Sequence, residues 1–366
     1  MAGSDSVHSA TTTRSVEGLG RPIADRPLVV NVVPFSIDGW RWFEADTTDQ
    51  IRWEFFGPAA QTWAERKLKW SSLALTRGCR KAVRFAGREG AKLLISHDPK
   101  ATYRCAEINR RSERPIPHLA WSFNFAALPK GLKRRLMTSA FRDVDRFVVF
   151  STMERELYAN YFDLPIDRFK MIHWAMGPLA MNPPDRPTVG GDYICSLGGN
   201  ARDYPTLMAA MAQLPDIPLV AVVRPDNLQG LTVPANVTVR TNIPFPDAIN
   251  ILNFSRFTVV PLVGSEVPCG HVTIVVAMQF GVAAVVTRST GLDDYAVVDQ
   301  TALTYQAHDA TDLARQIRRL WDDRALTQTL GSNGRQFFND HCAESVARSA
   351  LSDELTRYGL LTRAIV

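Results

Sequence analysis

Short apolar runs alternate with amphipathic stretches along most of the chain. The runs are rich in β-branched residues and almost entirely apolar, which is typical of strands covered on both faces of a sheet. Strands that alternate with helical patterns indicate βαβ units and parallel sheets. The runs predict strands at 28–34, 92–96, 118–122, 146–150 and 169–173, and then at 192–197, 218–223, 237–240, 257–261, 283–287 and 302–305.

A segment rich in proline and glycine interrupts this alternation at residues 177–191, as an interdomain linker would. It separates one domain at 28–176 from a second at 192–345, and a C-terminal helix at 346–366 is long enough to pack back on the first domain. Residues 1–27 are polar and predict a disordered leader. The predicted fold class is α/β, with two doubly wound, Rossmann-like domains facing a cleft, and ligands bind such sheets at the carboxyl ends of the strands.

Helical patterns follow several of the strands and dominate the C-terminus. The segment 309–322 begins at a capping residue, Asp309 or Thr311, and carries Leu313, Ile317 and Leu320 on one stripe. The patterns predict helices at 62–89, 205–214, 272–280, 309–322, 326–342 and 344–358.

Composition narrows the class of protein. The chain has 366 residues, of which 46% are hydrophobic and 22% charged, close to the average for soluble globular proteins. Its five cysteines are isolated and without CxxC spacing, which disfavours a disulfide framework or a cysteine zinc site and suits a reducing compartment. The longest apolar run, 272–287, is broken by Gln279 and Gly281 and is too short to span a bilayer.

A glycine pair follows the first strand of the second domain. Gly198 and Gly199 let backbone N–H groups approach an anion closely, and the helix that follows adds positive potential at its N-terminus. Arg202 can add a charge-assisted contact to a phosphate. The alternative is an ordinary strand-to-helix turn with a surface arginine.

A second candidate phosphate site precedes the predicted helix at 272–280. Gly270, His271 and Thr273 lie at its N-terminus, where free N–H groups and the threonine hydroxyl suit a diphosphate. Glu266 can accept hydrogen bonds from the vicinal hydroxyls of a ribose or sugar. The alternative is that Thr273 only caps the helix and His271 is a loop residue.

The order GGxxRDYxxL, two strands, PCGHVTIVVAMQFGVAAVVTxxxGLDDY and a DxxxLxxxIxxLxxD helix resembles the donor domain of GT-B glycosyltransferases. It is most similar to the large retaining family that includes many polysaccharide and glycolipid transferases. The resemblance covers 192–345 well and 28–178 by pattern. It implies that a nucleotide-diphosphate sugar binds the second domain, with its phosphates between Gly198, Gly199 and Arg202 on one side and Gly270, His271 and Thr273 on the other.

The resemblance also implies a nucleotide contact at Arg224 and a grip on the base at Asn242 and Ile243. The paired glutamates of the family fall near Pro268 and Val276, neither of which is acidic, so the chain resembles a divergent branch with a G-x-x-T phosphate grip. No metal-ligand pattern is visible in the sequence. Since positive groups at helix ends can stabilise a leaving diphosphate, we expect a metal-independent, cofactor-free reaction.

Positive charge is concentrated in the first half. Residues 1–178 hold 28 lysines and arginines against 19 acidic residues, whereas 179–366 hold 14 against 18. Basic stripes at Arg66–Arg88 and Lys130–Arg142 can contact an anionic membrane or hold a lipid-linked diphosphate, and the alternative is a solvated helix face. Nucleic acid is disfavoured because the second half is acidic and no nucleic-acid motif is present. The expected location is cytoplasmic, with peripheral contact to the inner face of the cell membrane.

Candidate acceptor-side residues follow two strands of the first domain. His97 and Asp98 follow the strand at 92–96, and Asn124 follows the strand at 118–122. His97 and Asp98 can deprotonate or orient an acceptor hydroxyl near neutral pH. The alternative for Asp98 is a loop cap before Pro99.

These observations favour a hexosyltransferase that moves a sugar from a nucleotide-diphosphate sugar to a glycan or lipid-linked acceptor. Two alternatives remain: a non-catalytic, membrane-associated protein that binds sugar nucleotides, and a sugar-nucleotide epimerase of the same fold. A nicotinamide-dependent dehydrogenase is disfavoured, because no strand leads into a GxGxxG turn.

Overall fold

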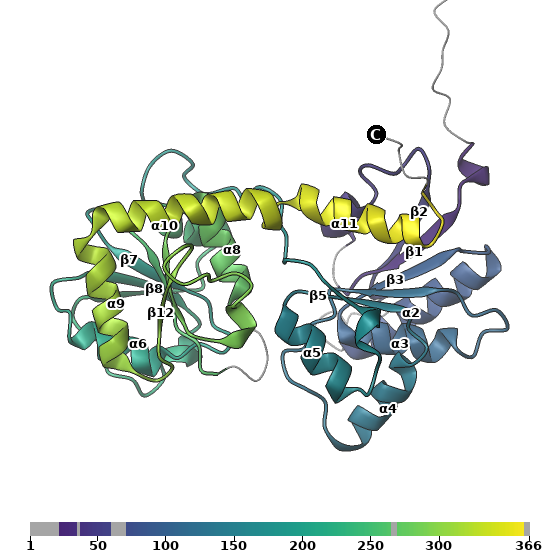
Figure 1. Ribbon diagram of the computed structural model, residues 1–366, viewed down its shortest axis with the longest axis horizontal. Coiled ribbons are helices and arrows are strands. Elements are labelled where there is room, and N and C mark those ends of the chain that lie inside the picture. The colour runs from purple at the N-terminus through teal and green to yellow at the C-terminus, as the bar shows by residue number, and fades with distance from the viewer. Residues whose placement is uncertain (1–21, 35–36, 60–70, 265–268, 362–366) are drawn as a thin grey trace, which may run out of the picture.

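The computed structural model describes residues 22–34, 37–59, 71–264 and 269–361. Most of the expected leader and the first part of the expected helix at 62–89 lie outside the described residues. The described chain forms two lobes side by side, each built around a six-stranded parallel sheet (Figure 1). This confirms the predicted fold class of two doubly wound α/β domains.

The first lobe has the strand order β2-β1-β3-β4-β5-β6. Five of its strands coincide with the predicted apolar runs. The exception is β2, which pairs with β1 at the edge of the sheet and was not expected from the sequence. The strands are β1 (Leu28–Val32), β2 (Arg52–Phe56), β3 (Leu93–His97), β4 (His118–Trp121), β5 (Arg146–Val149) and β6 (Phe169–Met171).

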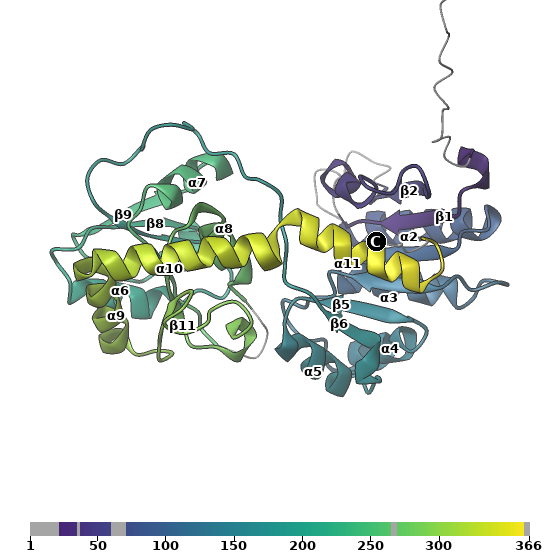
Figure 2. The ribbon, with the colours of Figure 1, turned by 45° about the horizontal axis from the view of Figure 1, so that its top comes forward.

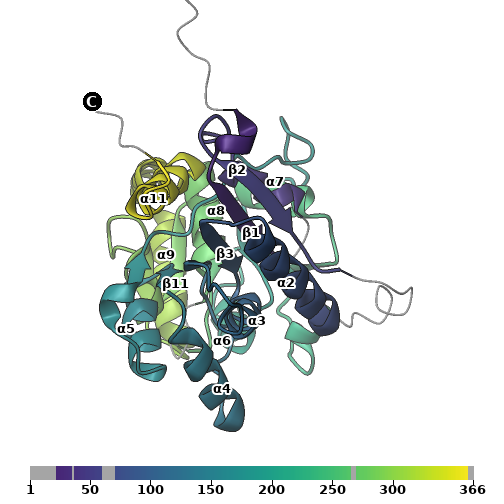
Figure 3. The same ribbon diagram turned by 90° about the vertical axis from the view of Figure 1, so that its right-hand side faces the viewer.

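Alternate residues of these strands serve two separate cores, as strands buried on both faces require. Val30 and Leu94 pack under α2 and α3, whereas Val29 and Leu93 contact the C-terminal helix α11. Figure 3 shows α11 and the pair α2 and α3 on opposite sides of the strands. The helices of this lobe are α2 (Ser71–Arg88), α3 (Pro99–Asn109), α4 (Gly131–Phe141) and α5 (Thr152–Tyr161), with short 3-10 turns η1 (Ile23–Asp25), η2 (Asp38–Phe43) and η3 (Ile166–Arg168).

The second lobe has the order β12-β11-β10-β7-β8-β9, so the order reverses between β7 and β10. All of its strands were predicted from the sequence. Its strands are β7 (Ile194–Leu197), β8 (Leu219–Val223), β9 (Val237–Thr241), β10 (Thr258–Val260), β11 (Ala284–Thr287) and β12 (Leu303–Tyr305). Its helices are α6 (Tyr204–Ala212), α7 (Phe245–Asn253), α8 (His271–Phe280), α9 (Ala310–Asp322) and α10 (Arg324–Phe337), with short turns η4 (Pro225–Leu228) and η5 (Thr290–Leu292).

The end of the chain returns from the second lobe to the first. Helix α10 continues through a π-turn, η6 (Phe338–Cys342), into α11 (Glu344–Arg357), which lies on the first lobe (Figures 1 and 2). Leu351 and Leu355 of α11 belong to the same apolar core as Val29. Glu354 is buried and forms an ion pair with Arg146 of β5 at 2.9 Å. A C-terminal helix therefore completes the first lobe.

The lobes also touch directly through α5 and the loop that follows β11. Asp294 accepts hydrogen bonds from the backbone N–H and the hydroxyl of Thr152, both at 2.7 Å. The buried hydroxyl of Tyr295 donates to the carbonyl of Phe150 at 2.6 Å and accepts from the N–H of Trp174 at 2.8 Å. These hydrogen bonds join the two lobes.

Within the described ranges, every helix is too short or too polar to cross a lipid bilayer. The five cysteines are free.

Candidate functional site

The strand order of the second lobe places a crevice between β7 and β10. Ligands of doubly wound sheets bind at such a reversal, outside the carboxyl ends of the strands. The loops after these two strands are joined by backbone hydrogen bonds: the N–H of Asp203 donates to the Pro261 carbonyl at 3.1 Å, and that of Val263 to the Ala201 carbonyl at 3.2 Å. The two candidate phosphate segments are therefore neighbours in space.

The glycine pair after β7 is required by its surroundings. Gly198 has a φ of 113°, and a Cβ there would lie 2.8 Å from the Arg202 guanidinium. A Cβ on Gly199 would lie 2.8 Å from the side chain of Arg224. The Tyr204 hydroxyl donates to the Gly198 carbonyl at 2.5 Å, which holds the turn in place. Only glycine lets both arginines approach this backbone so closely.

Arg202 links the two segments. Its guanidinium donates to the Thr273 hydroxyl at 2.8 Å and to the Asn200 carbonyl at 2.9 Å. Its Nε is buried without a hydrogen-bond partner among the described residues, and burial lowers the pKa of the guanidinium. No carboxylate of the described chain forms an ion pair with it. A half-buried cation without an anionic partner is costly, and an anionic ligand would compensate it.

The N-terminus of α8 faces the same place. Gly270 precedes the helix with a φ of 91°, and a Cβ there would press on Leu262 at 3.2 Å. His271 is buried, and burial together with Arg202 lowers its pKa to about 4, so it is neutral at pH 7. Ring contacts tie it to Phe150, Trp174 and Tyr295. His271 is therefore part of the packing between the lobes rather than a charged phosphate ligand.

A cavity of about 380 Å³ opens at this crevice. Six of the predicted donor-side residues line it: Gly198, Gly199, Arg224, Asn242, Ile243 and Thr273. The glycines, Thr273, Arg224 and Asn242 supply backbone and polar side-chain groups, and the rest of the lining is apolar. The apolar wall comes from β7, β8, α7 and α8 and consists of Leu197, Val222, Val223, Phe245, Ala248, Ile249, Leu252, Val272 and Val276.

This division suits a ligand with an anionic part and a flat apolar part, because ligand pockets are mostly apolar with a few placed polar groups. Val276, where the family that the sequence resembles has a glutamate, contributes an apolar side chain. Pro268 and the candidate Glu266 lie outside the described residues.

One contributor was not foreseen from the sequence. Asn227 in η4 accepts from the Arg224 N–H at 3.2 Å and donates to the Gly199 carbonyl at 2.9 Å, so it fixes the loop after β8 against the glycine turn. An asparagine four residues after a strand end is a common turn residue, so nothing else in the sequence singles it out. Asn242 has a φ of 55°, which a strand-to-helix corner requires and asparagine tolerates.

The acceptor-side candidates are not gathered with the donor-side residues. His97 is wholly buried between the rings of Trp40 and Phe43, and its Nε2 lies 2.9 Å from Asn31 Oδ1. Burial lowers its pKa well below the usual range, so it offers no accessible, titrating nitrogen to an acceptor. The expectation that His97 acts as a base toward an acceptor hydroxyl is therefore corrected: His97 is a buried residue of the first lobe.

Asp98 and Asn124 make local contacts. Asp98 caps α3, accepting from the Lys100 N–H at 2.6 Å, as its alternative reading stated. It also lines a groove of about 650 Å³ with Lys100, Arg104, Leu132 and Lys133. The Asn124 amide donates to the buried Glu154, whose other oxygen accepts from the Phe150 N–H at 2.7 Å. Asn124 therefore links the loop after β4 to Glu154 of α5.

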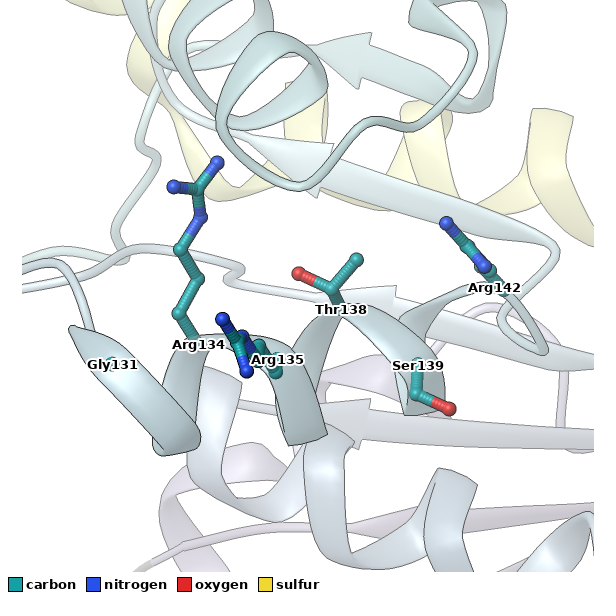
Figure 4. A pocket seen from close by; sticks show the side chains of 6 residues that line it. All are labelled: Gly131, Arg134, Arg135, Thr138, Ser139 and Arg142. Carbon is teal, nitrogen blue, oxygen red and sulfur yellow. The ribbon is translucent and has the colours of Figure 1, made fainter.

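The basic segment at Lys130–Arg142 forms the exposed face of α4 (Figure 4). Arg134, Arg135 and Arg142 surround an open hollow of about 550 Å³ with Thr138 and Ser139. Arg134 also lies over the Tyr161 ring at 4.3 Å and donates to its carbonyl. Leu132 is 71% exposed and Leu136 47% exposed on the same helix. Of the segment Arg66–Arg88, the part before Ser71 lies outside the described residues. Where the structure is described, no group of His, Cys, Asp and Glu has the geometry of a metal site.

Several solved structures resemble the whole chain. A sucrose-phosphate synthase from Thermosynechococcus elongatus has 16% identity and a TM-score of 0.69, over 91% of this chain and 98% of that one. HepE from Anabaena in complex with UDP has 14% identity and a TM-score of 0.68, over 91% and 100%. A glycosyltransferase from Rickettsia africae has 12% identity and a TM-score of 0.66, over 93% and 100%.

These likenesses show that the chain has the two-lobed GT-B fold, as the sequence predicted. No family model and no curated protein matches the sequence.

Proposed function

We propose that the protein is a glycosyltransferase that moves a hexosyl group from a nucleotide-diphosphate sugar to a hydroxyl of an acceptor bound at the first lobe. The acceptor oxygen forms a bond to the anomeric carbon, the bond from that carbon to the diphosphate breaks, and the nucleoside diphosphate leaves with the negative charge. The hydroxyl proton passes from the acceptor to a phosphate oxygen of the leaving nucleoside diphosphate, so that atoms and charge balance. The proposal combines the sequence resemblance, the GT-B fold and the cavity in the second lobe.

The observation that carries the proposal is the placement of Arg202. It bridges the glycine turn and the start of α8 at the edge of a cavity with room for a nucleotide, and no described carboxylate neutralises it. A diphosphate at this position would receive the guanidinium, the Thr273 hydroxyl and the free N–H groups of the α8 N-terminus. All three stabilise charge on a leaving diphosphate more strongly than in the intact donor. The neighbour HepE binds UDP, which makes uridine nucleotides the first donors to test.

Three finer features belong to the proposal. Retention of anomeric configuration rests on the family resemblance, and NMR of the product linkage tests it. Metal independence rests on the cationic groups already gathered at the site, and turnover in excess chelator tests it. The acceptor is a glycan or a lipid-linked saccharide, and the exposed cations and leucines of α4 suit contact with an anionic membrane from the cytoplasmic side.

Binding and turnover are measured separately. Thermal shift and calorimetry with UDP, GDP and their sugar derivatives should show that at least one nucleotide diphosphate raises the melting temperature, since a ligand that binds only the native state stabilises it. Release of that nucleotide from the sugar donor, with and without a lipid extract, then reports transfer. Binding without any donor breakdown would favour the non-catalytic alternative. Absence of binding by every nucleotide would refute the donor site itself.

A further inference from the structure

A second, smaller cavity lies in the first lobe beside the site and is walled by tryptophan. Its volume is about 160 Å³. Trp40 and Trp42 come from η2, Trp121 and Ser122 from the end of β4, Phe150 from the end of β5, and Trp174 from the segment after β6. Four of the eight tryptophans of the chain therefore meet in one place.

This aromatic cavity adjoins the donor cavity through one residue. The rings of Phe150 and Trp174 lie 6.1 and 6.3 Å from the ring of His271. The next two residues along the chain, Val272 and Thr273, line the donor cavity. Residues of both cavities therefore approach the α8 N-terminus, where the leaving diphosphate is proposed to bind.

The fold keeps this space open. Ala347 of α11 presents a small side chain to the cavity, and a Cβ on Gly39 would meet no atom within 4 Å. Ser122 has a φ of 53°, a conformation that costs energy for a residue other than glycine and that clusters at functional sites. The rings themselves are packed: Trp121 contacts Phe43 at 5.2 Å, and Trp40 contacts His97 at 3.9 Å. Rigid aromatic walls around a space left by alanine and glycine make a preformed site.

We propose that this cavity holds one neutral pyranose ring of the acceptor, so that the acceptor is a saccharide. The inference rests on the proposed function for the position of the reacting carbon. Aromatic faces receive the C–H face of a pyranose, while the sugar hydroxyls point to the rim, as amphipathic rings allow. The volume is below the roughly 300–1,000 Å³ of pockets for larger ligands, which fits a single small ring.

Charge distinguishes this cavity from a neighbouring groove of the first lobe. None of its described lining residues is ionisable, whereas the groove beside Asp98 carries Lys100, Arg104 and Lys133 next to exposed Leu132. A buried anion would have no partner in the aromatic cavity. An acidic sugar or a lipid phosphate is therefore excluded from it, and the aromatic cavity takes an uncharged sugar unit.

The test uses the full chain in the presence of UDP and the methyl pyranosides of glucose, galactose, mannose and N-acetylglucosamine as probes. Saturation-transfer NMR should detect at least one of them, with glucuronic acid and cyclohexanol as charged and non-sugar controls. Ala347→Met fills the space and Trp40→Ala removes a wall, so each should weaken pyranoside binding about tenfold or more, whereas Trp40→Phe should retain most of it. Ser349→Met, on the exposed face of α11, is the matched control and should change nothing.

UDP affinity, measured by calorimetry on the same samples, separates the two proposals. Pyranoside binding that is lost in Ala347→Met while UDP affinity is retained supports a saccharide site. UDP binding without binding of any pyranoside, equal pyranoside binding by wild type and Ala347→Met, or a preference for glucuronic acid or cyclohexanol would overturn it. Pyranoside binding without binding of UDP or of any other nucleoside diphosphate would leave the saccharide site standing and refute the donor site.

Discussion

Replacement of Arg202 tests the donor site most directly. The guanidinium bridges two loops, donates to Thr273 of the cavity wall and has no described anionic partner. A charge-assisted hydrogen bond contributes about 1.5–3 kcal/mol, so Arg202→Ala should raise the Kd for the preferred nucleoside diphosphate by about tenfold to a hundredfold. Thr273→Val removes the hydroxyl that accepts from Arg202 and should give a smaller loss.

The double variant distinguishes a shared site from two separate effects. Since Arg202 and Thr273 are in direct contact at 2.8 Å, their effects on nucleotide affinity should not add, with a coupling of about 0.5–3 kcal/mol. Isothermal titration calorimetry measures the three variants against Arg315→Ala, a control on the surface of α9 that pairs only with Asp312 among the described carboxylates. A nucleotide affinity for Arg202→Ala that matches the control would refute the reasoning.

A second substitution of Arg202, by methionine, separates a role in nucleotide binding from a role in stabilising the fold. Arg202 adds a half-buried charge to the ligand-free protein, so Arg202→Met should leave its melting temperature unchanged or raise it, although it weakens nucleotide binding. A large drop in the melting temperature of the ligand-free protein would show that Arg202 mainly stabilises the fold.

Two further predictions concern acid stability and lobe contact. Burial lowers the pKa of His118 to about 3 and contributes to a pKa of about 4 for His271, whereas unfolded histidine titrates near 6.5. Between these values the unfolded state binds more protons than the folded state. The free energy of unfolding should therefore fall as the pH drops from 6.5 to 4, by up to about 1.4 kcal/mol per pH unit for each histidine. Denaturant titrations at pH 7 and 5 check this, and His118→Gln should lose less stability than wild type; equal losses would contradict the assignment. Asp294→Ala removes the acceptor of both Thr152 hydrogen bonds and should increase the radius of gyration of the ligand-free protein in small-angle X-ray scattering. The control Asp293→Ala, at the exposed neighbouring residue, should not. Identical scattering of the two variants would show that these hydrogen bonds do not restrain the lobes.

The sequence predicted the sheets well because most strands are buried on both faces and read as continuous apolar runs. The strand β2 was missed because it is not such an apolar run. Its sequence, Arg52–Phe56, mixes charged and aromatic residues at the edge of the sheet, where burial is partial. Edge strands carry the weakest periodic signal, and β2 is recognised only through its pairing with β1.

The donor side could be predicted because its chemistry is local. Each of its segments is a strand, a glycine turn and a helix start within about a dozen residues, so the backbone N–H groups and the nearby side chains follow from one stretch of sequence. The acceptor side could not be predicted in this way, because its residues come from segments that are far apart in the sequence. His97 is buried by rings that η2 contributes from more than fifty positions earlier, and the aromatic cavity is assembled from five separate segments. No pattern within a single segment reports such contacts.

The return of α11 to the first lobe has a consequence for how the protein is made. Leu351 and Leu355 share a core with apolar strand residues whose own segment ends near residue 171, so part of one face of the first sheet stays uncovered until α11 has been synthesised. The lobe that is synthesised first is thus the lobe that is finished last. A cell making this chain must protect that apolar face throughout translation of the entire second lobe, and a truncation before Glu344 would leave it permanently exposed.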